Sequence, residues 1–276
     1  MFAVVGLGAV GSLLTYFLNS AGFTPYVATR TRCERFYFCI ETCVELKAEV
    51  VERVPPSVKY TFVAVKGPDT PSALAVAAGV PVIFQNGIGG LELARRRFPE
   101  ALGAVVTYGI YREGCRSELR GWGEIVLPIG AEEVAEVLKR GGAKVEVVPD
   151  IEPLRWAKLV VNAAINPITA ILQAPNGVVV ENPWARALAE KLATEAAAVA
   201  RARGYAVEDP VGAVFKVAEA TARNLSSMAQ DVMRCRPTEV DFINGAVVKH
   251  GEELGVETPF NRAAYLLVKA LEKRCS

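Results

Sequence analysis

The stretch FAVVGLGAVGSLL, residues 2–14, decides how the first half of the chain folds. Its glycines Gly6, Gly8 and Gly11 form a GxGxxG pattern between an apolar run and a helical one. In such a strand–turn–helix the first glycine permits the tight turn, the second lets the backbone approach a pyrophosphate, and the third lets helix and strand pack closely. Backbone N–H groups at the helix start then attract the anion. We therefore expect residues 6–11 to bind a dinucleotide; the alternative is a glycine-rich turn without a ligand.

Short apolar runs alternate with helical patterns up to about residue 149. Gly or Pro bounds the first runs, as is typical of buried parallel strands, at residues 2–5, 25–29, 61–65 and 80–85. Further strands are expected within residues 103–114, 121–130 and 144–149. The helical patterns cover about residues 11–20, 69–78, 90–97 and 131–140. Strands that alternate with helices predict an α/β, Rossmann-like doubly wound sheet.

Strand signals nearly vanish from Ile151 onward. Asn-Pro, Asp-Pro and Thr-Pro pairs suit helix starts in this half. The helical patterns cover about residues 152–172, 183–203, 210–224, 238–254 and 259–273. The sequence thus predicts two domains, a Rossmann-like nucleotide-binding domain over residues 1–149 and an all-helical, substrate-binding domain over residues 150–276.

Composition and charge exclude several classes of protein. The 276 residues are 51% hydrophobic and 22% charged, as in a globular protein. Lys and Arg total 31 against 30 Asp and Glu, which argues against a nucleic-acid binder. The apolar N-terminus lacks the basic region of a signal peptide, and no other stretch is long and apolar enough to span a bilayer, so we expect a cytoplasmic protein with no membrane partner.

The cysteines do not form a metal-binding pattern. The six lie at positions 33, 39, 43, 115, 235 and 275, with no CxxC pair and with His250 as the sole histidine, so no metal site is expected. In the cytoplasm these thiols should be reduced. The scarcity of Gln and His is nevertheless typical of thermophiles, in which a cytosolic disulfide is more plausible.

The residues after the second predicted strand favour NADPH over NADH. An Asp or Glu at this position would bind the ribose 2′-hydroxyl of NAD, but residues 28–32 read ATRTR and the first acid is Glu34. Arg30 is placed to hold a 2′-phosphate. The alternative is that Arg30 is part of a solvated basic loop. NADPH is the expected cofactor, with NADH as a weaker or alternative donor.

A polar stripe interrupts the apolar helical stretch RWAKLVVNAAINPITAI, residues 155–171. Lys158, Asn162 and Asn166 recur at steps of four and so share one helix face, and Pro167 should kink the helix near Asn166. Polar groups on an apolar helix need hydrogen bonds or a ligand. Lys158 could instead reach outward while the amides cap neighbouring groups. Because His250 lies in a polar helical stretch typical of the surface, a lysine is the better candidate for a proton donor.

A second polar cluster lies within residues 224–248. Asn224, Ser226 and Ser227 are expected in a helix-breaking turn, and Pro237 should start a new helix with Glu239 in its first turn. Glu239 there would interact with the helix dipole. Beside the lysine stripe it could instead position a substrate hydroxyl or the amine.

The chain resembles the 2-dehydropantoate 2-reductase (ketopantoate reductase) family over essentially its whole length. The resemblance rests on GLGAVGSLL, the VK of TFVAVKG, QNGIG, KLVVNAAINPITAI followed by PNG, and SSMAQDV…RPTEVDFINGAVV. It implies NADPH-dependent reduction of 2-dehydropantoate to (R)-pantoate, in pantothenate and coenzyme A biosynthesis.

The resemblance also implies roles for individual residues. Lys158 is similar to the family's proton donor, and Glu239 to the acidic residue that lies close to both ligands. The implied cofactor-binding residues are Gly6, Leu7, Gly8, Ala9, Val10, Gly11, Arg30, Lys66, Asn86, Ile110 and Glu239. The implied substrate-binding residues are Lys158, Asn162, Asn166, Asn176, Asn224 and Ser227.

Two other functions fit the same residues. One is a reductase of another small-molecule 2-oxo acid. The other is a non-catalytic NADPH sensor, against which the combination of Lys158, the amides and Glu239 argues. A helical second domain often supplies a dimer interface, so a homodimer is expected.

Overall fold

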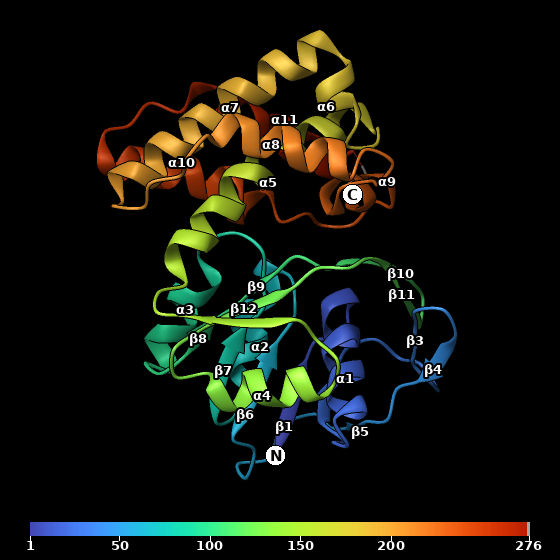
Figure 1. Ribbon diagram of the computed structural model, residues 1–276. Helices are drawn as coiled ribbons and strands as arrows, with labels where there is room; N and C mark the ends of the chain where they lie inside the picture. Colours follow the sequence, from blue (N-terminus) through green and yellow to red (C-terminus); the bar gives the residue numbers. More distant parts are fainter. Residues whose placement is uncertain (275–276) are drawn as a thin grey trace. The chain divides into compact units, whose positions relative to one another are not determined.

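The structure is a computed structural model that describes residues 1–274. The chain forms two compact units (Figure 1). The first contains residues 1–85 and 90–151, and the second contains residues 86–89 together with the chain from Glu152 onward. The short segment 86–89 therefore belongs with the helices that follow it much later in the sequence. No helix among the described residues is long and apolar enough to cross a membrane.

A parallel six-stranded sheet with the strand order β5-β2-β1-β6-β7-β8 forms the centre of the first unit (Figure 1). Its strands are β1 (Phe2–Val5), β2 (Tyr26–Ala28), β5 (Glu49–Val50), β6 (Tyr60–Val63), β7 (Val80–Ile83) and β8 (Leu102–Gly103). Strands β2 and β5 lie on one side of β1, and β6, β7 and β8 lie on the other side. The chain therefore crosses over β1 when it passes from one half of the sheet to the other. The predicted Rossmann-like, doubly wound sheet is confirmed.

Helices cover both faces of this sheet, which is why its strands are apolar on both sides. Phe2 and Val4 of β1 belong to one buried cluster, and Ala3 and Val5 to another. The first cluster includes residues of α1 (Ala9–Ser20) and α4 (Glu132–Arg140), and the second includes residues of α2 (Thr70–Val76) and α3 (Gly90–Arg97). Alternate side chains of one strand thus serve two hydrophobic cores.

Two small sheets complete the first unit. The sheet β10-β11-β3-β4 consists of β10 (Gly109–Glu113), β11 (Arg116–Gly121), β3 (Tyr37–Cys39) and β4 (Cys43–Glu45). The other, β13-β12-β9, consists of β13 (Val145–Val148), β12 (Ile125–Pro128) and β9 (Val105–Val106). The sequence pattern does not predict β3, β4, β5 or β8, because these strands are only two or three residues long and carry little periodicity.

The second unit is helical, as expected. Its elements are α5 (Glu152–Leu172), α6 (Val178–Glu181), α7 (Pro183–Ala202), α8 (Pro210–Ala220), α9 (Ser227–Met233), the 3₁₀ turn η2 (Val240–Phe242), α10 (Asn244–Leu254) and α11 (Pro259–Lys273). Helix α5 has the predicted bounds, runs through Pro167 and packs against α7, α8, α9 and α11. It is therefore the central helix of this unit.

Two predictions about residues 224–254 are wrong. Ser227 does not lie in a turn but begins α9, whose N-cap is Ser226. The helix expected from Pro237 begins only at Asn244, so Glu239 precedes η2 and is not in the first turn of an α-helix. The backbone N–H and the hydroxyl of Thr238 both donate to Glu272 Oε1, at 2.7 Å. This bond to α11 satisfies the backbone of residue 238 without a helix.

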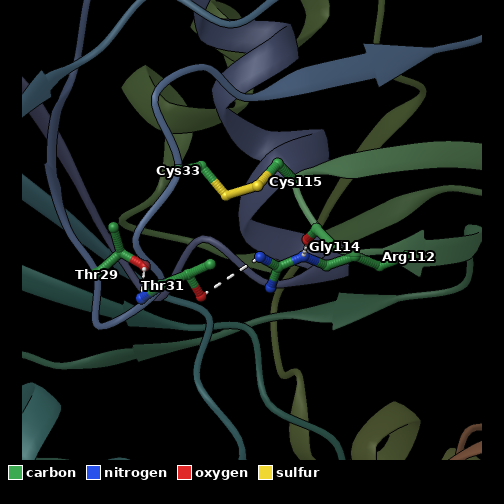
Figure 2. The surroundings of a disulfide bond; sticks show 6 residues. All are labelled: Thr29, Thr31, Cys33, Arg112, Gly114 and Cys115. Atoms are coloured by element: carbon green, nitrogen blue, oxygen red, sulfur yellow. Dashed lines mark hydrogen bonds between the residues drawn. A yellow bond between two sulfur atoms is a disulfide. The ribbon is translucent and has the colours of Figure 1, made fainter.

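Two disulfide bonds lie within the first unit, contrary to the expectation of reduced thiols. Cys33 bonds to Cys115 (Figure 2), and Cys39 bonds to Cys43. The first pair is 82 residues apart in sequence, but its Cα atoms lie 6.0 Å apart. Strand β3 runs parallel to β11 and so brings the residues before each strand together. Only the pairing of these strands makes this disulfide possible.

Removing Cys33–Cys115 should destabilise the protein more than removing Cys39–Cys43. In the chain-entropy model the first closes a much longer loop in the unfolded chain, so its loss should cost roughly 4 kcal/mol against roughly 2 kcal/mol for the second. Thermal unfolding of Cys33→Ser/Cys115→Ser and Cys39→Ser/Cys43→Ser variants measures this. An equal fall in Tm would show that loop length does not decide the contribution.

Candidate active site

The glycine turn 6–11 has the geometry that a dinucleotide needs. Gly6 has φ +92°, and its N–H donates to the carbonyl of Ala28 at 2.9 Å. A Cβ on Gly11 would lie 1.9 Å from the Gly6 oxygen, so helix and turn can pack only around glycine. A Cβ on Gly8, the N-cap residue of α1, would meet no described atom closer than 3.9 Å. The residues fit a bound dinucleotide, because the first and third glycines are structural and the second leaves space for a phosphate.

The side chains of Leu7, Ala9 and Val10, between the glycines of the turn, are buried or half-buried. Leu7 is fully buried in the core cluster of α1 and β1, while Ala9 and Val10 are half-buried in the first turn of α1. The side chains therefore anchor the turn to the core. Its backbone N–H groups are the part that can meet an anion.

Arg30 lies two residues after the end of β2 and forms an ion pair with Asp69. Its side chain is 77% exposed, so a 2′-phosphate could reach it. Asp69 ends the 3₁₀ turn η1 (Gly67–Asp69), which begins after the half-buried Lys66. Ile110 lies in β10 opposite Leu119, beside an irregularity in the register. Asp69 was not foreseen as a neighbour of Arg30, because the two are 39 residues apart.

Segment 86–89 is held against the residues that follow Glu239. The N–H of Ile88 donates to the carbonyl of Phe242 at 2.9 Å. Gly87 has φ +80°, and a Cβ there would lie 2.1 Å from the same oxygen. Gly87 must be glycine for both reasons. This close backbone approach fixes the position of Asn86.

Asn86 links the two predicted catalytic residues. Lys158 Nζ donates to Asn86 Oδ1 at 2.7 Å, and Asn86 Nδ2 donates to Glu239 Oε2 at 3.2 Å. Glu239 is buried, with 9% of its surface exposed. The amide thus has its oxygen toward the amine and its nitrogen toward the carboxylate, which matches donor to acceptor on both sides.

Burial lowers the pKa of Lys158 from 10.5 to about 8, while the negative charge of Glu239 acts in the opposite direction. An amine with this pKa is still mostly protonated at neutral pH and can release its proton far more readily than an exposed lysine.

The predicted substrate amides differ in their surroundings. Asn162 is half-buried and Asn166 is buried, and within residues 1–274 neither side-chain amide makes a hydrogen bond. Asn176 is also buried, but its Nδ2 donates to Thr221 Oγ1 at 2.9 Å and its N–H to the carbonyl of Asn224 at 2.9 Å. Asn176 therefore braces the turn that carries Asn224, but its buried Oδ1 has no hydrogen-bond partner among the described residues. Like the amides of Asn162 and Asn166, it presents a polar group that a ligand would satisfy.

Residues Asn224 and Ser227 are exposed at the start of α9. Between them Ser226 is buried, caps α9 through the N–H of Ala229 and lies 2.7 Å from the hydroxyl of Thr169 in α5. His250 pairs with Glu253 at 3.0 Å and packs against Trp156, so it is not part of the lysine network. The structure thus brings Lys158, Asn86 and Glu239 into direct contact and places Asn176 beside Asn224.

A Rossmann-like unit with a GxGxxG turn, followed by a helical unit that holds a half-buried lysine, is an arrangement typical of nicotinamide-dependent oxidoreductases. Comparison with known proteins narrows the class. Residues 2–132 match the family model "Ketopantoate reductase PanE/ApbA", and residues 150–272 match its C-terminal counterpart. The chain belongs to the ketopantoate reductase family.

Individual relatives agree with this assignment. The chain is 55% identical to a 2-dehydropantoate 2-reductase of Pyrobaculum aerophilum, over 100% of this chain and 99% of the relative. Among solved structures, a PanE/ApbA family ketopantoate reductase from Ralstonia eutropha JMP134 is similar with a TM-score of 0.89 and 28% identity, over 100% and 99% of the two chains. A D-mandelate dehydrogenase solved with NADH and anilino(oxo)acetate shares the fold, with a TM-score of 0.90, 22% identity and the same coverage.

The lowered pKa of Lys158 can be tested without turnover. Acylation of the amine by a small reagent, followed by mass spectrometry as a function of pH, should show a midpoint near 8 instead of 10.5. Glu239→Gln should move the midpoint lower, because it removes the charge that stabilises the ammonium ion. An unchanged midpoint in this variant would contradict the electrostatic link.

Proposed function

We propose that the protein catalyses the NADPH-dependent reduction of 2-dehydropantoate to (R)-pantoate, with Lys158 as the proton donor. The observation that carries the proposal is the Lys158–Asn86–Glu239 network, with its hydrogen bonds of 2.7 and 3.2 Å. The printed name of the Pyrobaculum relative supports the substrate. A steady-state assay of 2-dehydropantoate with NADPH and NADH in parallel tests the proposal as a whole.

Lys158 acts on the substrate carbonyl in two ways. As an ammonium ion it donates a hydrogen bond to the carbonyl oxygen and polarises the C=O bond. A nicotinamide held by the turn 6–11 would supply the hydride for the carbonyl carbon. Lys158 then transfers its proton to the oxygen, which becomes the hydroxyl of the product. The resulting neutral amine is reprotonated from solvent, which its pKa of about 8 permits at neutral pH.

The neighbours of Lys158 keep it in the reactive state. Glu239 favours the ammonium form and so offsets part of the effect of burial. Asn86 holds the amine without competing as an acid, because an amide does not titrate. The side-chain amides of Asn162 and Asn166, one and two helical turns beyond Lys158, would bind the polar groups of the oxo acid.

Cofactor preference is attributed to Arg30, and cofactor binding to the turn 6–11. The turn's backbone N–H groups would hold the pyrophosphate, and Arg30 the 2′-phosphate. Lys66, Asn86, Ile110 and Glu239 would contribute further contacts. Because the carboxylate of Asp69 already pairs with Arg30, a bound 2′-phosphate must share or replace it.

Replacement of Lys158 should abolish most of the activity. Lys158→Ala should lower kcat by about 10²–10⁴, the usual contribution of a general acid. Lys158→Arg should be nearly as poor, because arginine keeps the charge but does not release its proton. Steady-state kinetics and NADPH titration measure the two effects, and NADPH affinity should be largely retained.

Lys249→Ala provides the matched control, since Lys249 is an exposed lysine in the same unit. It should leave kcat unchanged. A Lys158 variant with near wild-type kcat would assign proton donation to another group.

Arg30→Ala should raise the KM for NADPH and leave that for NADH almost unchanged, since only the 2′-phosphate contact is lost. The loss of one charge-assisted hydrogen bond corresponds to roughly a tenfold effect. Arg32→Ala removes a neighbouring exposed arginine and serves as the control. Equal losses with both cofactors would instead assign Arg30 a structural role.

Two further aspects are part of the proposal. A panel of 2-oxo acids distinguishes 2-dehydropantoate from another oxo-acid substrate, and dinucleotide binding without any turnover would indicate a sensor.

A homodimer is proposed because Phe260, Leu266 and Leu267 of α11 expose apolar surface. Light scattering of the purified protein measures its oligomeric state.

A further inference from the structure

Arg112, in strand β10, lies beside the second glycine of the dinucleotide turn. A Cβ built on Gly8 would be 3.9 Å from Nη1 of Arg112. Gly8 is the N-cap residue of α1, and in such turns it is the residue that the pyrophosphate approaches. The guanidinium group therefore borders the space that a pyrophosphate would occupy.

Hydrogen bonds to two neighbouring segments orient this guanidinium group (Figure 2). Its Nε donates to the carbonyl of Gly114 at 3.1 Å, and its Nη2 donates to Thr31 Oγ1 at 3.4 Å. The first bond ties Arg112 to the turn of its own hairpin. The second ties it to the loop that follows β2, one residue beyond Arg30. An arginine held in this way loses little conformational freedom when it binds an anion.

The Cys33–Cys115 disulfide joins the same two segments. Cys33 lies two residues beyond Thr31, and Cys115 follows Gly114. Residues 31–36 have no regular secondary structure, so their position depends on such links. The disulfide, the two hydrogen bonds of Arg112 and the intervening backbone form a closed ring of connections (Figure 2).

We propose that Arg112 is an additional pyrophosphate-binding residue and that the Cys33–Cys115 disulfide holds it in place. The planar donor group of arginine matches phosphate oxygens. NADPH and NADH share the pyrophosphate, so Arg112 should serve both equally, whereas Arg30 would distinguish them. The inference rests on the proposed function only in that the ligand is a nicotinamide dinucleotide.

Calorimetric titration of the full-length protein with NADPH and with NADH tests the inference. Arg112→Ala should raise both dissociation constants by a similar factor, about tenfold for a charged hydrogen bond. Arg112→Lys retains the charge and should lose less. The Tm of the ligand-free protein should change little, because the Cys33–Cys115 disulfide still joins the two segments that Arg112 links. A purely structural role predicts a clear fall in Tm.

Arg116→Ala is the matched control. Arg116 pairs with Glu113 in the register of the hairpin, and Arg112 pairs with Ser117. Adjacent residues of a strand point to opposite faces, so Arg116 lies on the face away from Arg112. Its removal takes the same charge from the same hairpin and should leave both dissociation constants unchanged.

The role of the disulfide is tested by combining variants. Cys33→Ser/Cys115→Ser should raise both dissociation constants several-fold in the presence of Arg112 and have little further effect in the Arg112→Ala background. Cys39→Ser/Cys43→Ser should have no effect on binding. Additive losses would overturn the claim that the disulfide acts through Arg112.

The remaining outcomes separate this inference from the proposed function. Wild-type affinity for both dinucleotides in Arg112→Ala, or a loss confined to NADPH, overturns the pyrophosphate contact. If the wild-type protein binds neither dinucleotide, both the inference and the proposed function fail. If Arg112→Ala weakens both dinucleotides but the wild-type enzyme does not reduce 2-dehydropantoate, only the proposed function fails.

Discussion

Burial of an amine on an apolar helix is the constraint around which the second unit is organised. Lys158 lies on α5, the helix that the other helices of this unit surround, and desolvation lowers its pKa to about 8. An amine in this position needs a hydrogen-bond acceptor, and Asn86 supplies it. Asn86 lies in the first half of the sequence, but segment 86–89 is part of the second unit. That segment can reach this position only because Gly87 lets its backbone approach Phe242. The negative charge of Glu239 raises the pKa of Lys158 and so opposes the effect of desolvation.

The nucleotide side of the molecule is built differently. Its glycine turn is rigid, because Gly11 packs directly on the Gly6 carbonyl and Leu7 is fully buried. Arg112, which lies beside the turn, comes from the β10–β11 hairpin. The small sheet β10-β11-β3-β4 brings this hairpin next to the segment that contains Cys33 and leads into β3. A disulfide reinforces this pairing.

Local periodicity explains which elements could be predicted. The strands of the central sheet that were predicted are apolar on both faces, and α5 carries a long 3.6-residue pattern, so both were identified from the sequence. The short strands β3 and β4 have no such pattern and form because they pair with each other and with β11. The helix start at Asn244 was missed because Thr238 bonds to Glu272, 34 residues away.

The sequence by itself determined the glycine turn, the central helix with its stripe of Lys158 and two asparagines, and the resemblance to ketopantoate reductases. These features lie within single segments, where residue spacing translates directly into geometry. Only the tertiary structure decided the partners of these residues. Lys158 and Asn86 are 72 residues apart, Cys33 and Cys115 are 82 apart, and Asn86 and Glu239 are 153 apart. Such contacts depend on how strands pair and helices pack, which the period of a single helix or strand does not encode.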